Sequence, residues 1–167
     1  MDPVLDQVPT IDATAFKTVL GRFASGVTVI TALDEGEPIG FACQSFASLS
    51  IDPPLVSFFP ARTSSTWPRI REVGRFCVNI LADDQTDMCR QLGRPGPDKF
   101  TGVEWTRSGN GSPLLTGAMA SIDCYLYDEV DGGDHTIVIA RVTGLTEHSE
   151  ARPLLFYRAA FNRLGEQ

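Results

Sequence analysis

A row of four hydroxyl side chains directly follows Arg62 in this sequence: Thr63, Ser64, Ser65 and Thr66. The row predicts a helix that begins at Ser64 or Ser65 and ends at Gly74, because serine is a preferred helix cap and glycine a common terminator. Hydroxyls at a helix N-terminus add donors to its free backbone N–H groups, and an arginine binds phosphate through two parallel hydrogen bonds. The segment 62–66 is therefore a candidate anion site, with an ordinary polar turn as the alternative.

The preceding stretch, residues 40–50, is unusual for a core strand because small and hydroxyl side chains outnumber large apolar ones. A buried strand usually carries β-branched and aromatic residues. Here the small side chains leave room for a flat molecule to lie against the backbone, and they are Ala42, Cys43, Ser45, Ala47, Ser48 and Ser50. The alternative interpretation is a bent edge strand.

Two further residues are candidates for ligand contact. Lys99 follows the breaker-rich loop 93–98 and is a second candidate cation, although a solvated loop lysine is the simpler interpretation. His135 follows Gly-Gly-Asp and precedes an apolar strand over 136–140, which places it at a strand mouth, where ligands meet small barrels. A structural histidine is the alternative there. His148 lies among polar neighbours and is typical of a surface residue.

Signatures of several enzyme classes are absent from the sequence. It contains no GxGxxG that opens a helix after a strand, no GxxxxGK[ST], no HExxH and no GxSxG. Its 2 histidines are too few and too far apart for a histidine-rich metal site. The sequence therefore argues against a Rossmann nucleotide binder and a zinc hydrolase.

The charge balance bears on the class of partner. A formal net charge of -7 argues against nucleic acid, whose binding depends on phosphate neutralisation. One local exception is a group of arginines with a single acid, Glu72, among them: Arg62, Arg69, Arg71 and Arg75. This positive island suits a small anionic ligand, or else is a solvated helix face.

Length and composition predict one domain, with a tail over residues 1–12 and a single domain over 13–167. No apolar run approaches the ~18 residues of a membrane span. The first residues do not form a signal peptide, so we expect a cytoplasmic protein without membrane contact. The cysteines lie far apart without a CxxC pair, which favours reduced, packed thiols, and they are Cys43, Cys77, Cys89 and Cys124.

The expected elements are mostly short strands. Asp12 caps a first helix that ends at Gly26 and whose apolar face is Phe16, Val19, Leu20 and Phe23. Asp83-Asp84 caps a helix that runs to about Leu92. Strands are expected at 27–33, 38–44, 55–59, 75–81, 118–129, 137–146, 154–157 and 160–161. About seven or eight strands with two or three helices predict a mainly β, antiparallel barrel with a few peripheral helices.

Taken together, these segments resemble the short-chain NAD(P)H:flavin oxidoreductases, the flavin reductase components of two-component flavin-dependent monooxygenases. The matching segments are GRFASGVTVIT (21–31), SFASLSIDPPLV (45–56), GRFCVNIL (74–81), DKF (98–100), GDHTIVIARV (133–142) and PLLFYR (153–158). Each segment is weak alone, whereas their joint order and spacing are specific. The resemblance implies a split antiparallel β-barrel of the FMN-binding, Greek-key type, and a homodimer that binds FMN or FAD near its interface.

The resemblance also implies roles for particular residues. The flavin ring would be lined by Phe41, Ala42, Cys43, Gln44 and Ser45, with Ser48, Leu49 and Ser50 near its other groups. The ribityl phosphate would lie along Pro60, Ala61, Arg62, Ser64 and Ser65, and Lys99 and Phe100 would complete the site. The nicotinamide side would contain His135 as the catalytic residue. Residue 42 is often threonine in similar proteins and is alanine here.

The implied function is reduction of free FMN or FAD by NADH or NADPH, with hydride transfer to flavin N5. The reduced flavin would pass by diffusion to a transiently bound partner monooxygenase, for aromatic or steroid-ring hydroxylation. One alternative is a flavin- or haem-binding split-barrel protein without reductase activity, such as a pyridoxamine-phosphate-oxidase-like protein. Another is a non-enzymatic dimeric interaction module with the positive island as its partner surface.

Overall fold

Antiparallel strands make up most of the fold in the computed structural model, which describes residues 8–165. Residues 1–7 of the expected tail lie outside the described residues, so the boundary at residue 12 stays a prediction. The helices are α1 (Ala13–Leu20), α2 (Trp67–Val73) and α3 (Thr86–Gly93). The strands are β1 (Ser25–Gly26), β2 (Thr28–Asp34), β3 (Glu37–Cys43), β4 (Phe46–Ser50), β5 (Leu55–Phe58), β6 (Arg75–Ile80), β7 (Trp105–Arg107), β8 (Pro113–Leu115), β9 (Ala120–Gly132), β10 (His135–Glu147), β11 (Leu155–Tyr157) and β12 (Ala160–Asn162).

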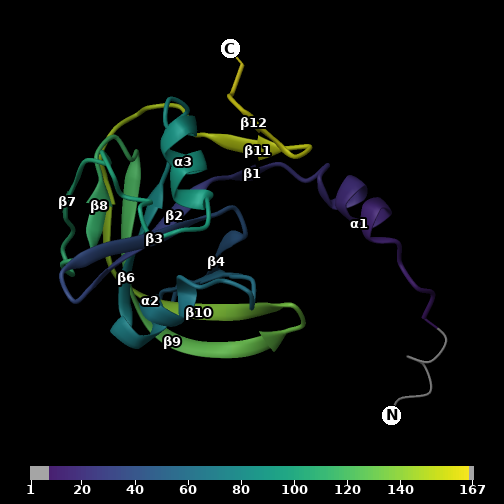
Figure 1. The fold of residues 1–167 in the computed structure, drawn as a ribbon, viewed down its shortest axis with the longest axis horizontal. Helices are drawn as coiled ribbons and strands as arrows, with labels where there is room; N and C mark the ends of the chain where they lie inside the picture. The colour runs from purple at the N-terminus through teal and green to yellow at the C-terminus, as the bar shows by residue number, and fades with distance from the viewer. Residues whose placement is uncertain (1–7, 166–167) are drawn as a thin grey trace.

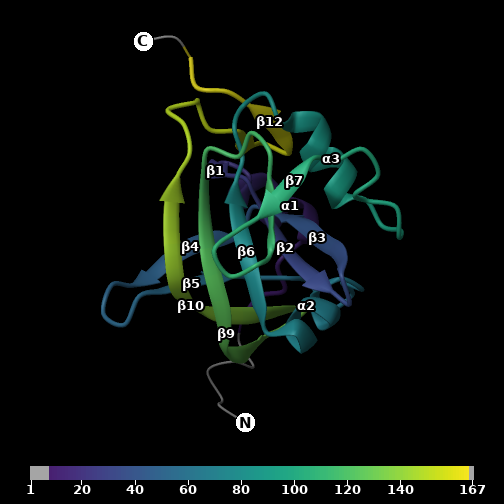
Figure 2. The same ribbon diagram turned by 90° about the vertical axis from the view of Figure 1, so that its left-hand side faces the viewer.

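The central sheet has 7 strands in the order β3-β2-β6-β9-β10-β5-β4, all antiparallel. Its two edge strands, β3 and β4, are consecutive in the chain and are joined only through Gln44 and Ser45. The sheet therefore has to curl until its edges meet, and Figures 1 and 2 show the resulting barrel. The predicted mainly β, antiparallel split barrel with peripheral helices is confirmed.

Several element boundaries differ from those expected. The hairpin of β9 and β10 reaches the tight turn at Gly133 because the strands continue pairing through Gly132 and His135. Neither Asp83 nor Asp84 caps α3; its N-cap is Gln85, whose side-chain oxygen accepts from the Ala82 N–H at 2.9 Å. Residues 8–165 form 12 strands, because the sequence pattern did not reveal the short strands β1, β4, β7 and β8.

Aromatic rings fill the barrel interior below α2. The rings of Phe58, Trp67 and Phe76 meet edge to face at centroid distances of 5.3, 5.6 and 6.0 Å, and all three are buried. A second apolar cluster, which includes Val29, Leu92 and Leu115, packs α3 against the sheet. Burial of this much aromatic surface dominates the stability of a domain of this size.

The small sheet of β7 and β8 is joined to the barrel by a buried asparagine. The Asn79 Nδ2 donates to the carbonyl of Val29 and to Thr31 Oγ1, and its Oδ1 accepts from the Leu115 N–H at 2.8 Å. Every polar atom of this buried side chain has a partner, as burial of an amide requires.

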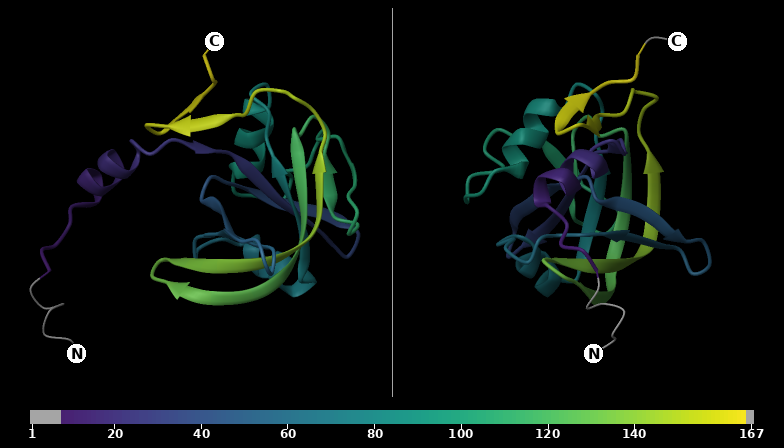
Figure 3. Two further views of the ribbon diagram at one scale, coloured as in Figure 1. Left: turned by 180° about the vertical axis from the view of Figure 1, so that it is seen from behind. Right: turned by 90° about the vertical axis from the view of Figure 1, so that its right-hand side faces the viewer.

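Helix α1 lies away from the barrel. Its predicted cap is confirmed, since Asp12 Oδ2 accepts from the Ala15 N–H at 2.8 Å, but the helix ends at Gly21 instead of Gly26, which belongs to β1. None of its residues is buried. Figure 3 shows the helix projecting from the body of the molecule. The apolar face predicted for α1 thus exists, and residues 8–165 leave it exposed.

The cysteine prediction is confirmed within the described residues: Cys43, Cys77, Cys89 and Cys124 are free and buried. Residues 8–165 also hold no cluster of three or more side chains suited to a metal ion. None of the helices described is long and apolar enough to cross a membrane.

Candidate functional site

A cavity of about 470 Å³ opens where β3 ends and the chain turns toward β4. We call it the main cavity. Its lining residues come from four segments of the chain and are Phe41, Ala42, Cys43, Gln44, Ser45, Phe59, Pro60, Ala61, Thr63, Ser64, Ser65, Thr66, Gly93, Arg94, Pro95, Lys99 and His135. One wall is therefore a strand of the barrel, and the other is made of loops.

The strand wall is fixed by its neighbours. Residues of β3 pair with β2 along their whole length, and Thr28 Oγ1 donates to the Cys43 carbonyl at 2.6 Å. Ser45 Oγ contacts both backbone groups of Phe59, accepting from its N–H and donating to its carbonyl at 3.2 Å each. Ser45 therefore ties the connection between β3 and β4 to the residue that follows β5, and its hydroxyl is already engaged.

Gln44 lies at the end of this wall, where its side chain is oriented by β1. The Ser25 hydroxyl donates to Gln44 Oε1 at 3.1 Å. The amide oxygen is thus occupied, which leaves the Gln44 NH₂ group as the donor available to a ligand.

The loop wall carries the hydroxyl row. Ser64 Oγ accepts from the Trp67 N–H at 3.1 Å, just ahead of α2. The predicted cap at Ser64 or Ser65 is wrong, because α2 begins at Trp67 and its N-cap residue is Thr66. Gly74 ends that helix in the left-handed conformation at φ 75°, as predicted. The row follows the sharp turn at Pro60 and lines the main cavity with hydroxyl groups that donate hydrogen bonds.

Lys99 is the cation on this wall. Its Nζ donates to the Gly40 carbonyl and to Thr66 Oγ1, at 3.4 Å each, and both acceptors are neutral. Burial without a carboxylate partner lowers the pKa of Lys99 from its ordinary value of 10.5. Among residues 8–165 no carboxylate lies within ion-pair distance of the Lys99 ammonium group, which favours an anion beside it.

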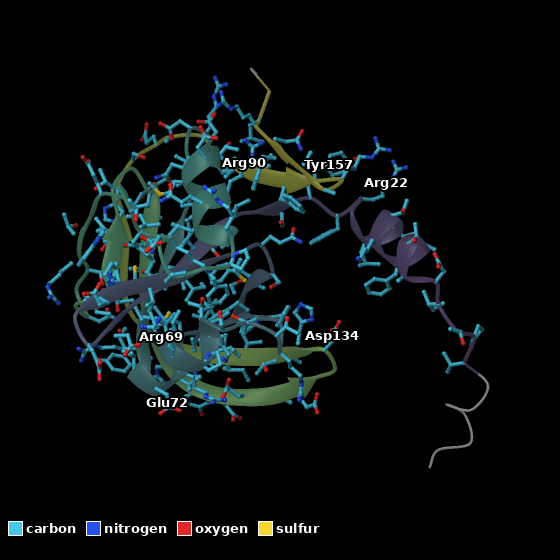
Figure 4. All side chains as sticks on the ribbon, viewed as in Figure 1. Arg22, Arg69, Glu72, Arg90, Asp134 and Tyr157 are labelled. Atoms are coloured by element: carbon cyan, nitrogen blue, oxygen red, sulfur yellow. The ribbon has the colours of Figure 1, made fainter. Side chains whose placement is uncertain are left out.

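His135 stands at the mouth of the main cavity. Its Nδ1 lies 2.7 Å from Asp134 Oδ1, and the interaction with His135 holds the pKa of Asp134 below its usual range. The backbone around it is held by a bridge between Ala61 and His135, and by the Arg62 N–H, which donates to the Asp134 carbonyl at 2.9 Å. Figure 4 shows Asp134 at the tip of the β9–β10 hairpin.

The positive island proposed from the sequence is largely neutralised. Arg62 pairs with Asp131 at 2.8 Å, Arg69 with Asp34 at 2.7 Å, and Arg71 lies 3.8 Å from Glu129. The acids come from strands distant in the sequence, which is why a count of neighbouring charges did not reveal them. These three arginines therefore do not form a free anion-binding surface.

Most of the predicted site residues meet in the main cavity, and five do not. Ser48, Leu49 and Ser50 continue along β4, Arg62 turns toward Asp131, and Phe100 packs in the second apolar cluster. Their contact with a ligand stays a prediction. The residues that the sequence did not single out are Phe59, Gly93, Arg94 and Pro95. Gly93, Arg94 and Pro95 belong to the predicted loop at 93–98. The glycines and prolines of this loop were the one sequence feature that could have indicated a contact with the ligand.

Comparison with known proteins agrees with this geometry. Residues 20–165 match the family described as flavin reductase like domain. The chain is 54% identical over 151 residues to a flavin-dependent monooxygenase reductase subunit, HsaB, of Rhodococcus jostii, covering 90% of this chain and 77% of that protein.

Solved structures give the same result. The crystal structure of a nitrilotriacetate monooxygenase component B homologue from Mycobacterium thermoresistibile is 48% identical, with a TM-score of 0.88 over 97% of this chain and 88% of that one. A Streptomyces globisporus NADH:FAD oxidoreductase, SgcE6, solved with NAD and FAD fragments, is 30% identical with a TM-score of 0.87, over 95% of this chain and 98% of that one.

Proposed function

This chain belongs to the flavin reductase like family and is a flavin reductase, and we propose that it reduces free FMN or FAD with NADH or NADPH for use by a partner monooxygenase. A bound flavin would supply the redox chemistry, as acceptor of a hydride from the nicotinamide, and the protein itself would not. The task of the chain is to hold the two rings against each other and to keep water from the point of contact.

The observation that carries the proposal is the lining of the main cavity, which combines small neutral residues with hydroxyls and a lysine. Ala42, Ala61 and Gly93 present little bulk, as a planar three-ring system needs. The hydroxyl row and Lys99, which are in contact through Thr66, match a ribityl phosphate. The residues present therefore fit a flavin.

The nicotinamide is assigned to the side of His135. That residue borders both the main cavity and an apolar cavity of about 690 Å³ beneath α1, to which Phe16, Phe59 and Ile137 also contribute. Asp134 holds Nδ1 of His135, so Nε2 is the nitrogen left to contact the carboxamide or ribose. His135→Ala should raise the KM for NADH or lower kcat; unchanged values of both would exclude this role.

We further propose a homodimer, on the evidence of α1. Phe16 is 56% exposed and Phe23 is 81% exposed, and both line apolar cavities between α1 and the barrel. An apolar face of this kind on a helix is normally covered. A second copy is the proposed cover, because Ser45 and Phe59 border these cavities as well as the main one, which places the interface beside the flavin site. Sedimentation of Phe16→Ser/Phe23→Ser, against the unaltered protein, tests it: a dimer that persists in the variant would contradict this interface.

Reduced flavin then reaches a transiently bound partner oxygenase by diffusion. The resemblance in sequence implies that this oxygenase hydroxylates an aromatic or steroid ring. The decisive experiment measures NADH and NADPH oxidation with FMN, FAD and riboflavin as acceptors. Turnover that requires added flavin is expected. Flavin binding without oxidation of either nicotinamide would leave the pyridoxamine-phosphate-oxidase-like alternative and would overturn the proposal.

A further inference from the structure

A second cavity, of about 500 Å³, adjoins the loop wall of the main cavity. We call it the outer cavity. Arg94, Pro95 and Lys99 border both cavities, so the two cavities adjoin at these residues. A ligand whose phosphate lies beside Lys99 in the main cavity can therefore extend from that phosphate into the outer cavity.

The chemistry of the outer cavity differs from that of the main one. Pro95 and Pro97 present flat apolar rings, and Asp98 contributes a carboxylate that accepts hydrogen bonds. Gln91 also borders the outer cavity and holds two other residues of its lining, because its Nε2 donates to the carbonyls of Lys99 and Thr101 at 2.8 Å each. Apolar faces with a hydrogen-bond acceptor suit an adenine ring, its amino group and ribose hydroxyls better than another phosphate.

Arg94 stands at the border between the two cavities. Within residues 8–165 no carboxylate lies within ion-pair distance of it, unlike Arg62, Arg69 and Arg90. An arginine with free N–H groups binds a phosphate bidentately. Lys99 and Arg94 together thus offer one cation to each phosphate of a pyrophosphate.

We propose that the outer cavity binds the adenosine half of FAD and that Arg94, at its entrance, distinguishes FAD from FMN. This inference rests on the proposed flavin reductase site and adds the identity of its preferred flavin. The ADP half of NADH is the competing occupant. It is disfavoured because His135, on the nicotinamide side, borders the apolar cavity beneath α1 and does not border the outer cavity.

The test compares the KM for FAD with the KM for FMN in the full-length protein at saturating NADH. Arg94→Ala should raise the KM for FAD about tenfold, as expected for loss of a hydrogen bond to a charged group, while the KM for FMN changes much less. Arg90→Ala is the matched control, one turn earlier on α3. Figure 4 shows Arg90 beside the β11–β12 hairpin, where it pairs with Asp87 at 3.4 Å and lies over the Phe161 ring. It should leave both values unchanged.

A second variant tests the space itself. Thr101→Trp places a large ring in the outer cavity and leaves the Thr101 carbonyl that Gln91 contacts, so FAD reduction should fall while FMN reduction continues. FMN turnover in the same preparation shows that each variant is folded. Equal changes for both flavins, or a higher KM for NADH measured with FMN, would overturn the inference. Absence of turnover with every flavin in the unaltered protein would instead overturn the proposed function.

Discussion

The two walls of the main cavity are built in different ways. The strand wall is part of the central sheet, pairs with β2 along its length and carries small neutral side chains. The loop wall consists of segments 59–66 and 93–99, which are held by a few side-chain contacts and carry the hydroxyls and cations. Shape therefore comes from the sheet and charge from the loops. Changes in the strand should affect every flavin, whereas changes in the loops should affect only flavins that carry phosphate.

The largest effect is expected from filling the strand wall. Ala42→Phe places a ring where the flavin ring is proposed to lie, and overpacking of about 1–3 kcal/mol should lower kcat/KM by about 5- to 150-fold for riboflavin and FMN alike. Steady-state NADH oxidation measures this. Ala151→Phe, in an exposed loop, is the control. A loss confined to FMN would mean that the strand does not contact the ring.

Removal of the loop cation should have a smaller and more selective effect. Lys99→Met removes the cation that contacts the hydroxyl row through Thr66, so the KM for FMN should rise about tenfold. Riboflavin has no phosphate, and its KM should not change. An equal rise for riboflavin would place Lys99 at the ring and would remove the distinction between the two walls.

The pH dependence should show the same distinction without a mutation. Lys99 loses its charge as pH rises through its pKa, which burial holds below 10.5. The FMN phosphate is already a dianion above pH ~8, so kcat/KM for FMN should fall on the alkaline side at a pH below that of an exposed lysine. The riboflavin profile should lack this fall, and so should Lys99→Met with FMN. A fall shared by both flavins would assign it to another group.

The smallest effect is expected at the arginine that the sequence pattern favoured. Arg62→Met removes a half-exposed ion pair with Asp131, and such pairs contribute little, so the KM for FMN should change by less than about twofold. A rise equal to that of Lys99→Met would restore Arg62 to the phosphate site as predicted from the sequence.

The contrast between the strand wall and the loop wall also explains which features of the site could be predicted from the sequence. Strand periodicity and the spacing of Pro53, Pro60 and Gly74 located the barrel strands and the turn into α2, because such signals are local. The hydroxyl row and Lys99 were identified by residue type. Arg62 was placed with the ligand because Asp131, its partner, is far away in the sequence and near it only in the fold. Arg94 was overlooked for the same reason, since nothing in its neighbours shows that the loop reaches the cavity.

The α1 helix shows a further limit of the same kind. Its cap at Asp12 and its apolar face were both predictable, because capping and helical periodicity are local properties. The neighbouring residues do not show what covers this face. Helical periodicity predicts an apolar face that needs burial, but the residues that bury it belong to a second molecule or to a distant segment of the chain.

The buried cysteines have a consequence for how the protein tolerates its own chemistry. Reduced flavin that escapes into aerated solution reacts with dioxygen and yields hydrogen peroxide, which attacks thiolates far faster than thiols. Burial raises the pKa of Cys77 to about 12 and that of Cys89 to about 11, and it also raises the pKa of Cys43 and Cys124. At neutral pH all four are therefore protonated. Cys77, Cys89 and Cys124 do not line the main cavity, and Cys43, which does, is kept as the less reactive thiol beside the proposed source of peroxide.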